Sequence, residues 1–254
     1  MISTRVKAVR VDKPFLRSIS LKHEKIEIPD VYPFSIPCVK VLDRIDFHPD
    51  ITFLIGENGT GKSTLLEAIA IAWGFNAEGG SKNFNFATRP SHSDLHDYIR
   101  MSRSTKMPSD GFFLRAESFY NVATQIDELG SFRPYGGKSL HAQSHGESFL
   151  SLILYRFHGH GLYILDEPEA ALSPMRQLAM LRRIQHLIQQ HSQFIIATHS
   201  PILLAYPGAK ILTLNESGFT ETPYEETEHF TVTRRFLNDH EGFLKKLFTD
   251  DETD

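Results

Sequence analysis

Nine consecutive residues have the types and spacing of a phosphate-binding loop. They read Gly56-Glu57-Asn58-Gly59-Thr60-Gly61-Lys62-Ser63-Thr64 and match G-x-x-x-x-G-K-[ST] in full. The glycines allow the backbone to curl, so that successive N–H groups and the N-terminus of the following helix face one anionic cavity. Lys62 then reaches the β- and γ-phosphates, and the Ser63 hydroxyl ligates Mg²⁺. The alternative is a glycine-rich turn followed by Lys-Ser by chance.

A second candidate is a pair of carboxylates, Asp166 and Glu167, directly after the apolar run 162–165. A strand that ends here places Asp166 at the carboxyl edge of a sheet, where open α/β sheets bind ligands. We expect Asp166 to hold Mg²⁺ through its water shell and Glu167 to orient or deprotonate the attacking water. Taken alone, such a run also ends in ordinary surface carboxylates.

Two shorter motifs complete the set. Thr198-His199-Ser200 follows the apolar run 194–197, and His199 there can hydrogen-bond the γ-phosphate, although a single His at a strand end is more often structural. Ser144-His145-Gly146-Glu147 stands ahead of an apolar helical segment.

With this fourth motif, the order and spacing of the set resemble the ABC-type ATPases. The resemblance implies ATP and Mg²⁺ as ligands, with Glu167, His199 and Lys62 as the catalytic residues. It also implies that Ser144 and Gly146 contact the γ-phosphate on the loop of a second subunit. The implied assembly is a head-to-tail homodimer that forms on ATP binding.

The motifs depart from the family pattern at several positions. Gln143, His145 and Glu147 replace the Leu, first Gly and Gln of the usual signature, and Ser173 stands where transporter subunits usually carry Asp. The segment Glu167–Pro174 is closer to the stand-alone RecF/OLD-like predicted ATPases than to a transporter subunit.

Two further sites of the family have only weak candidates here. The glutamine loop is expected after the strand at 111–114, where Glu117 and Gln125 are the nearest polar candidates. Tyr32 and Phe34 lie at a suitable distance before the loop for an aromatic ring that stacks on adenine. Solvated loop positions and core packing are the respective alternatives.

The predicted elements that position these residues indicate an α/β fold. Apolar runs predict buried strands at 51–55, 111–114, 162–165, 194–197 and 211–214, and helices at 63–73, 148–157, from 173 onward, and at 230–248. The helix after 173 has an expected apolar stripe of Leu178, Leu181, Ile184 and Leu187/Ile188. Alternation at 5–11, 18–28 and 39–47 predicts antiparallel strands, and 76–108 a long loop with one helix around Leu95–Met101.

We therefore expect an ABC-type P-loop NTPase fold with a mostly parallel sheet, an N-terminal antiparallel β part and a small helical subdomain. Residues 1–254 form one ATPase domain: 1–50 the antiparallel part, 76–160 the helical subdomain with the signature, 161–215 the half with Asp166 and His199, and 216–254 a helical tail.

Composition limits the other possibilities. The 254 residues are 41% hydrophobic with a net charge of −4, which excludes a protein held to nucleic acid by bulk charge. Basic residues near the start nevertheless leave a nucleic-acid or acidic-partner face open, against a solvated strand face: Arg5, Lys7, Arg10, Lys13, Arg17, Lys22 and Lys25. A single cysteine, Cys38, and the lack of a signal-like or membrane-length apolar stretch predict a cytoplasmic location.

Three functions remain open. The first is an ATPase (ATP phosphohydrolase) that drives an unknown protein partner, in DNA repair or phage defence as the RecF/OLD-like resemblance implies. The second is the nucleotide-binding subunit of a membrane ABC transporter, which Ser173 and the missing glutamine loop disfavour. The third is a slow, ATP-gated binding module.

Overall fold

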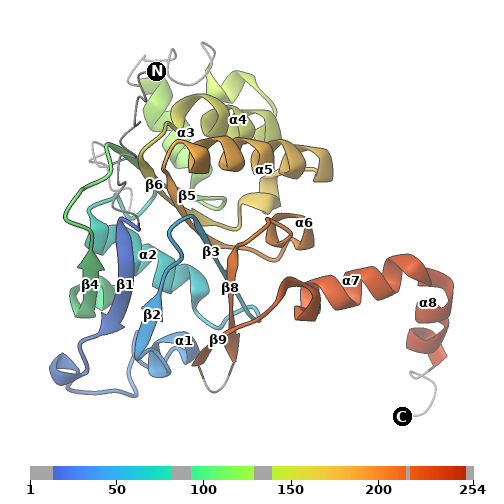
Figure 1. The fold of residues 1–254 in the computed structure, drawn as a ribbon, viewed down its shortest axis with the longest axis horizontal. Coiled ribbons are helices and arrows are strands. Elements are labelled where there is room, and N and C mark those ends of the chain that lie inside the picture. The colour runs from blue at the N-terminus through green and yellow to red at the C-terminus, as the bar shows by residue number, and fades with distance from the viewer. Residues whose placement is uncertain (1–13, 82–92, 129–138, 216–217, 250–254) are drawn as a thin grey trace, which may run out of the picture.

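The computed structural model describes residues 14–81, 93–128, 139–215 and 218–249, and the strand expected at 5–11 lies outside them. The larger of its two sheets has the order β5-β6-β7-β3-β8-β9 (Figure 1). Its strands are β3 (Ile51–Ile55), β5 (Asp110–Arg115), β6 (Gly161–Asp166), β7 (Gln193–Ala197), β8 (Lys210–Asn215) and β9 (Gly218–Glu221). The first five in this order are parallel, and β9 runs antiparallel to β8. The mostly parallel α/β fold is confirmed.

The central strands are buried along their whole length. Every residue of β3, β6 and β7 is buried, as continuous apolar runs in a parallel sheet covered on both faces require. Successive residues of β3 alternate between two hydrophobic cores: Phe53 packs with the residues of one face, and Leu54 packs with those of the other. The loop that follows β3 therefore starts from a strand held on both sides.

The helices are distributed over both faces of this sheet (Figure 1). They are α1 (Pro37–Lys40), α2 (Lys62–Trp73), α3 (Phe119–Glu128), α4 (His145–Ser151), α5 (Pro174–Gln189), α6 (Pro201–Leu204), α7 (Glu228–Asn238) and α8 (His240–Thr249). Side chains of α2 belong to one core, and those of α3, α4 and α5 belong to the other. Among the described residues, none of the helices combines the length and the apolar character needed to cross a membrane.

A smaller antiparallel sheet has the order β2-β1-β4, with β1 at Leu16–Leu21, β2 at Arg44–Asp46 and β4 at Ile99–Arg103. The helix expected around Leu95–Met101 is present only as a 3-10 helix, Asp94–Tyr98, and the residues from Ile99 onward belong to β4, which pairs with β1 along its length. The hydrogen bonds of a strand come from a partner far away in the sequence, so local periodicity did not reveal it.

Two other expectations need correction. The strand expected at 39–47 is shorter, because Pro37 opens the helical turn α1 and leaves only β2 extended. On α5, Ile184 and Leu187 of the expected stripe are buried, whereas Leu178 is 50% exposed and Gln177 and Met180 are buried in addition. The buried face of α5 is thus rotated toward a polar residue, Gln177.

The tail is helical as expected, but its apolar side chains are not covered. Neither α7 nor α8 has a buried residue, and Figure 1 shows both helices extending away from the sheet. The exposed apolar side chains are Val232, Phe236, Leu237, Leu247 and Phe248. The division of the chain at 50, 160 and 215 stays a prediction, and β5, within 76–160, belongs to the main sheet.

Candidate functional site

The loop between β3 and α2 has a backbone that only glycine tolerates at its last turn. Gly61 has φ 92° and caps the N-terminus of α2. A Cβ atom there would lie 2.0 Å from Cγ2 of Ile36 and 2.9 Å from Sγ of Cys38. The loop is therefore packed tightly against α1 and the segment before it, and its amides stay directed toward the start of α2.

The Lys62 side chain folds back across this loop. Its Nζ donates to the carbonyl oxygens of Gly56 and Glu57 at 2.7 Å each, and the residue is only 5% exposed. Burial lowers the pKa of Lys62, against the raising effect of the Glu167 and Asp166 carboxylates. The ammonium group is thus held at the loop, near the position where a bound phosphate would need a counter-charge.

Ser63 and Asp166, the two expected metal ligands, lie together. The Ser63 hydroxyl donates to Oδ1 of Asp166 at 3.1 Å, which joins the start of α2 to the end of β6. Burial raises the pKa of Asp166 to about 6, although the charge of Arg115 and the Ser63 hydrogen bond oppose this shift.

These oxygens fit a Mg²⁺ site. One hydroxyl and one carboxylate suit an ion that keeps several waters and takes the rest of its ligands from phosphates. The described residues contain no group of three or more His, Cys, Asp or Glu side chains suited to an all-protein metal site. A cation held jointly by protein and nucleotide agrees with this pair of oxygens.

Glu167 adopts an unusual backbone conformation next to this pair. Its φ is 48°, in the left-handed region, and its amide donates to the carbonyl of Ala197 at 3.0 Å. Its partly exposed Oε1 lies 3.9 Å from Nε2 of His199. A non-glycine residue held in this region is often functional, and here it places a carboxylate between the ends of β6 and β7.

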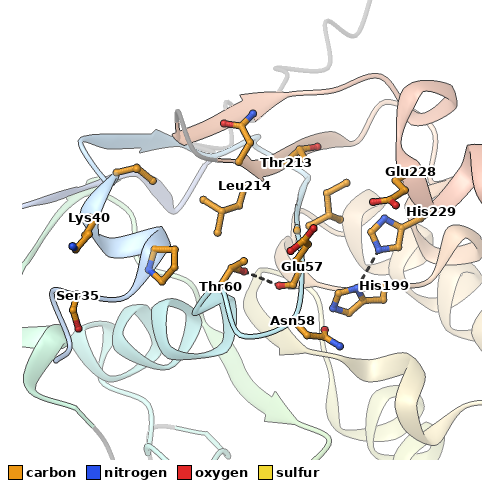
Figure 2. Close-up of a pocket in the computed structure, with 15 residues that line it drawn as sticks. Ser35, Lys40, Glu57, Asn58, Thr60, His199, Thr213, Leu214, Glu228 and His229 are labelled. Atoms are coloured by element: carbon orange, nitrogen blue, oxygen red, sulfur yellow. Dashed lines mark hydrogen bonds between the residues drawn. The ribbon is translucent and has the colours of Figure 1, made fainter. Parts of the chain in front are cut away.

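His199 is held through its backbone and its ring. Its amide donates to Oε1 of Glu169 at 2.5 Å, and its Nδ1 lies 3.1 Å from Nε2 of His229 (Figure 2). His229 comes from the first turn of α7. The sequence analysis did not identify it, because it belongs to no motif and lies within the segment 216–254, which was predicted only as a helical tail.

Arg115 is a second residue that the sequence analysis missed. It ends β5, and its Nε lies 3.6 Å from Oδ2 of Asp166, while Nη1 is hydrogen-bonded to Glu67. Glu117, a candidate for the glutamine loop, is exposed and lies 3.5 Å from Nη2 of Arg115. Gln125 lies on α3 and lines neither of the pockets described next.

Two pockets flank the loop. The smaller, of about 330 Å³, is lined by residues of the loop and α2 together with Tyr32, Ile36 and Glu167. The larger, of about 890 Å³, lies between the loop, α1, β8 and the start of α7, and includes His199 and His229 (Figure 2). Each pocket reaches one side of the loop.

The two candidates for adenine stacking have different surroundings. Tyr32 lines the smaller pocket and is 60% exposed. Phe34 packs against the main core and contacts Tyr98 edge to face, with ring centroids 4.7 Å apart. Tyr32 has a ring face available for a base, whereas Phe34 has a structural role.

Ser144 and Gly146 line neither pocket. Ser144 is the N-cap of α4, and its amide donates to Oε2 of Glu147 at 3.1 Å. A Cβ atom on Gly146 would lie 2.6 Å from both the Ala171 carbonyl oxygen and Nη1 of Arg176. The structure thus brings the loop, Asp166, Glu167 and His199 together within one chain and leaves the signature residues outside that group.

Comparisons with known proteins cover both halves of the site. A family model described as "AAA domain" matches residues 36–121, and one described as "AAA domain, putative AbiEii toxin, Type IV TA system" matches residues 147–205. A search of curated proteins finds no match. The first segment contains the loop, and the second contains Asp166, Glu167 and His199. Each half of the site is thus similar to an AAA domain.

Solved structures to which the chain is similar include the SMC head domain from Thermotoga maritima. It is 15% identical, the match covers 83% of this chain and 99% of that one, and the TM-score is 0.45. An ATP-binding cassette of an ABC transporter, in its ADP conformation, is 18% identical over 84% of this chain and 92% of that one, with a TM-score of 0.47.

Proposed function

We propose that the protein binds Mg-ATP and hydrolyses it at the loop between β3 and α2. Lys62 and the loop amides hold the β- and γ-phosphates, with Tyr32 beside the base. Ser63 and Asp166 hold Mg²⁺, which when bound offsets phosphate charge. His199 lies beyond Glu167 and contacts the γ-phosphate.

The attacking water is activated by Glu167 in this proposal. The carboxylate accepts a proton from the water as its oxygen attacks the γ-phosphorus, and the bond to the β,γ-bridging oxygen breaks. The left-handed backbone of Glu167 directs its side chain toward the smaller pocket, which it lines together with Lys62 and Ser63. The observation that carries the proposal is the 3.1 Å contact between Ser63 and Asp166 with Glu167 adjacent to it.

The test compares ATP hydrolysis by the parent with Lys62→Ala and Glu167→Gln. We expect Lys62→Ala to lose nucleotide binding or turnover, and Glu167→Gln to bind ATP while kcat falls by about 10²–10⁴-fold. Glu226→Gln, at an exposed carboxylate in the turn before α7, is the matched control and should hydrolyse at the parent rate. Turnover by Lys62→Ala equal to that of the parent contradicts the proposal.

We also propose that ATP brings two copies together head to tail, with Ser144 and Gly146 of each copy facing the ATP of the other. Support comes from their position outside the pockets of their own chain. Light scattering of Glu167→Gln should show the mass doubling with Mg-ATP. Ser144→Asp keeps a good N-cap but adds a negative charge, so in this background it should remain monomeric; Ser144→Thr should still dimerise.

The work driven by hydrolysis is done on a separate partner in this proposal. DNA and protein are the two classes to distinguish. Of the seven basic residues near the start, Arg17, Lys22 and Lys25 fall within the described part of the chain, and Lys22 donates to the carbonyl of Asp97. A rise in kcat on adding double-stranded DNA, lost at high salt, would favour DNA; no response would favour a protein partner.

A further inference from the structure

His229, in the first turn of α7, is in direct contact with His199 of the candidate site. Its Nε2 lies 3.1 Å from Nδ1 of His199, and the two rings are 5.3 Å apart at 42° (Figure 2). The short distance between two ring nitrogens requires one proton between them, because a neutral imidazole has one N–H and one acceptor nitrogen.

Two arrangements of that proton are possible. If His199 donated from Nδ1, its Nε2 would carry a lone pair toward Oε1 of Glu167, which lies 3.9 Å away. If His229 donates from Nε2, then Nε2 of His199 carries the proton and faces the carboxylate. The second arrangement is favoured, because a lone pair and a carboxylate repel each other.

The groups around the two rings limit the protonation states that the pair can adopt. Burial and the nearby His199 ring lower the pKa of His229, so it stays neutral near pH 7 and has only one N–H to donate. The other charged groups near the pair are Glu169, bonded to the His199 amide, Lys62 and Glu228. In the described part of the chain, Nε2 of His199 is buried and has no hydrogen-bond partner.

The start of α7 is itself held in place. The buried Thr227 caps the helix by accepting from the Phe230 amide at 3.3 Å. The Tyr224 hydroxyl donates to the carbonyl of Pro201 at 2.9 Å, two residues after His199. These contacts hold the start of α7, which carries His229, against the segment that directly follows His199.

We propose that His229 is a positioning residue for His199, which it holds in the tautomer that presents Nε2–H to the γ-phosphate. This inference rests on the proposed function. A histidine whose second nitrogen is bonded to a fixed partner keeps one tautomer and one ring orientation, and loss of such a partner typically reduces activity by about 10–100-fold. His229 acts through His199 and does not itself touch the substrate.

The first test measures steady-state ATP hydrolysis. We expect His229→Leu to lower kcat by about 10–100-fold with little change in KM for ATP. His229→Gln can place an amide N–H where Nε2 was, and it should recover most of that loss. His240→Leu, on α8, is the matched control and should behave as the parent. In a His199→Ala background, His229→Leu should have no further effect, because the two residues act as one unit.

The second test does not depend on hydrolysis. Two-bond ¹H–¹⁵N imidazole spectra of the nucleotide-free protein should show His199 protonated at Nε2 in the parent and in His229→Gln. In His229→Leu, a population protonated at Nδ1 should appear.

These tests separate the two proposals. An unchanged tautomer together with an unchanged kcat in His229→Leu rejects the inference and leaves the proposed function standing. If the parent hydrolyses no ATP but His229→Leu shows the expected change in the tautomer of His199, the proposed function is rejected and the role of His229 is kept.

Discussion

At the scale of single residues, Asp166 is a buried carboxylate whose desolvation exceeds the compensation from its partners. It is buried at the end of β6, bonded to Ser63, with Nε of Arg115 at 3.6 Å. Arg115 is also bonded to Glu67 and lies 3.5 Å from Glu117, so its charge is shared among three carboxylates. Asp166 therefore stays partly uncompensated, and burial outweighs its partners in setting its pKa.

This imbalance predicts that Asp166→Asn stabilises the nucleotide-free protein. Because the folded pKa, about 6, is above the ordinary value, the folded state binds more protons between about pH 4 and 6. The free energy of unfolding of the parent therefore falls as pH rises through this window. The asparagine variant should gain up to about 3 kcal/mol above pH 6, and the gain should shrink toward pH 4. Urea unfolding in EDTA at several pH values measures it.

Asp110→Asn is the control, and its effect on the free energy of unfolding should have the opposite sign. Burial raises the pKa of Asp110, but its hydrogen bond and ion pair with Arg156 outweigh burial and leave the pKa below its ordinary value. This variant should be less stable than the parent at neutral pH, with the difference shrinking as the pH falls. A gain in stability from Asp110→Asn, or a loss from Asp166→Asn at pH 8, contradicts the electrostatic account.

At the scale of elements, the loop before α2 depends on how closely α1 approaches it. Gly59 and Gly61 both have positive φ, 77° and 92°. A Cβ atom on Gly59 would meet nothing within 4 Å, whereas on Gly61 it would collide with Ile36 and Cys38. An alanine at Gly59 therefore adds backbone strain alone, whereas an alanine at Gly61 adds both strain and a packing collision.

We expect Gly59→Ala to cost about 1–2 kcal/mol, the strain of a left-handed alanine. Gly61→Ala should cost more and should also displace α1, so that binding of a fluorescent ATP analogue is lost. Thermal unfolding and titration with the analogue measure the two effects. Equal losses in the two variants would show that α1 does not hold the loop.

At the scale of the whole molecule, the C-terminal helices divide into a docked part and an extended part. The start of α7 is fixed through Thr227 and His229, whereas α8 contacts α7 through pairs such as Phe236 and Phe243, with ring centroids 5.7 Å apart. Neither helix has a buried residue. The stability of the main sheet should therefore not depend on α8.

A chain ending at Asp239 tests this division. We expect its free energy of unfolding to lie within about 1 kcal/mol of the parent, since no residue of α8 is buried, and its kcat to be unchanged. A chain ending at Thr227 lacks His229 and should lose kcat as His229→Leu does. Loss of activity already at Asp239 would show that α8 has a role in the ATPase site.

Much of this arrangement could be predicted from sequence, for physical reasons that differ between elements. The glycine-rich loop and the flanking runs are recognisable because steric freedom and burial act locally. Strand β4 was missed because its partner, β1, lies far away in the chain. Arg115 and His229 were missed because their importance comes from side-chain contacts between distant elements. The buried face of α5 was misjudged because Gln177 satisfies its amide on Leu172 and Ser200, which makes a polar residue acceptable in the core.

The position of β3 in the sheet has a consequence for synthesis of the protein. Both neighbours of this strand come from late in the chain, with Ile51 opposite Phe194 and Thr52 opposite Lys210. A nascent chain that has left the ribosome only as far as α5 has no partner on either side of β3, and such distant pairings form slowly. The loop before α2, although encoded early, can be anchored only after β7 and β8 have emerged. If this loop binds ATP as proposed, chains stalled before β8 should fail to bind the nucleotide.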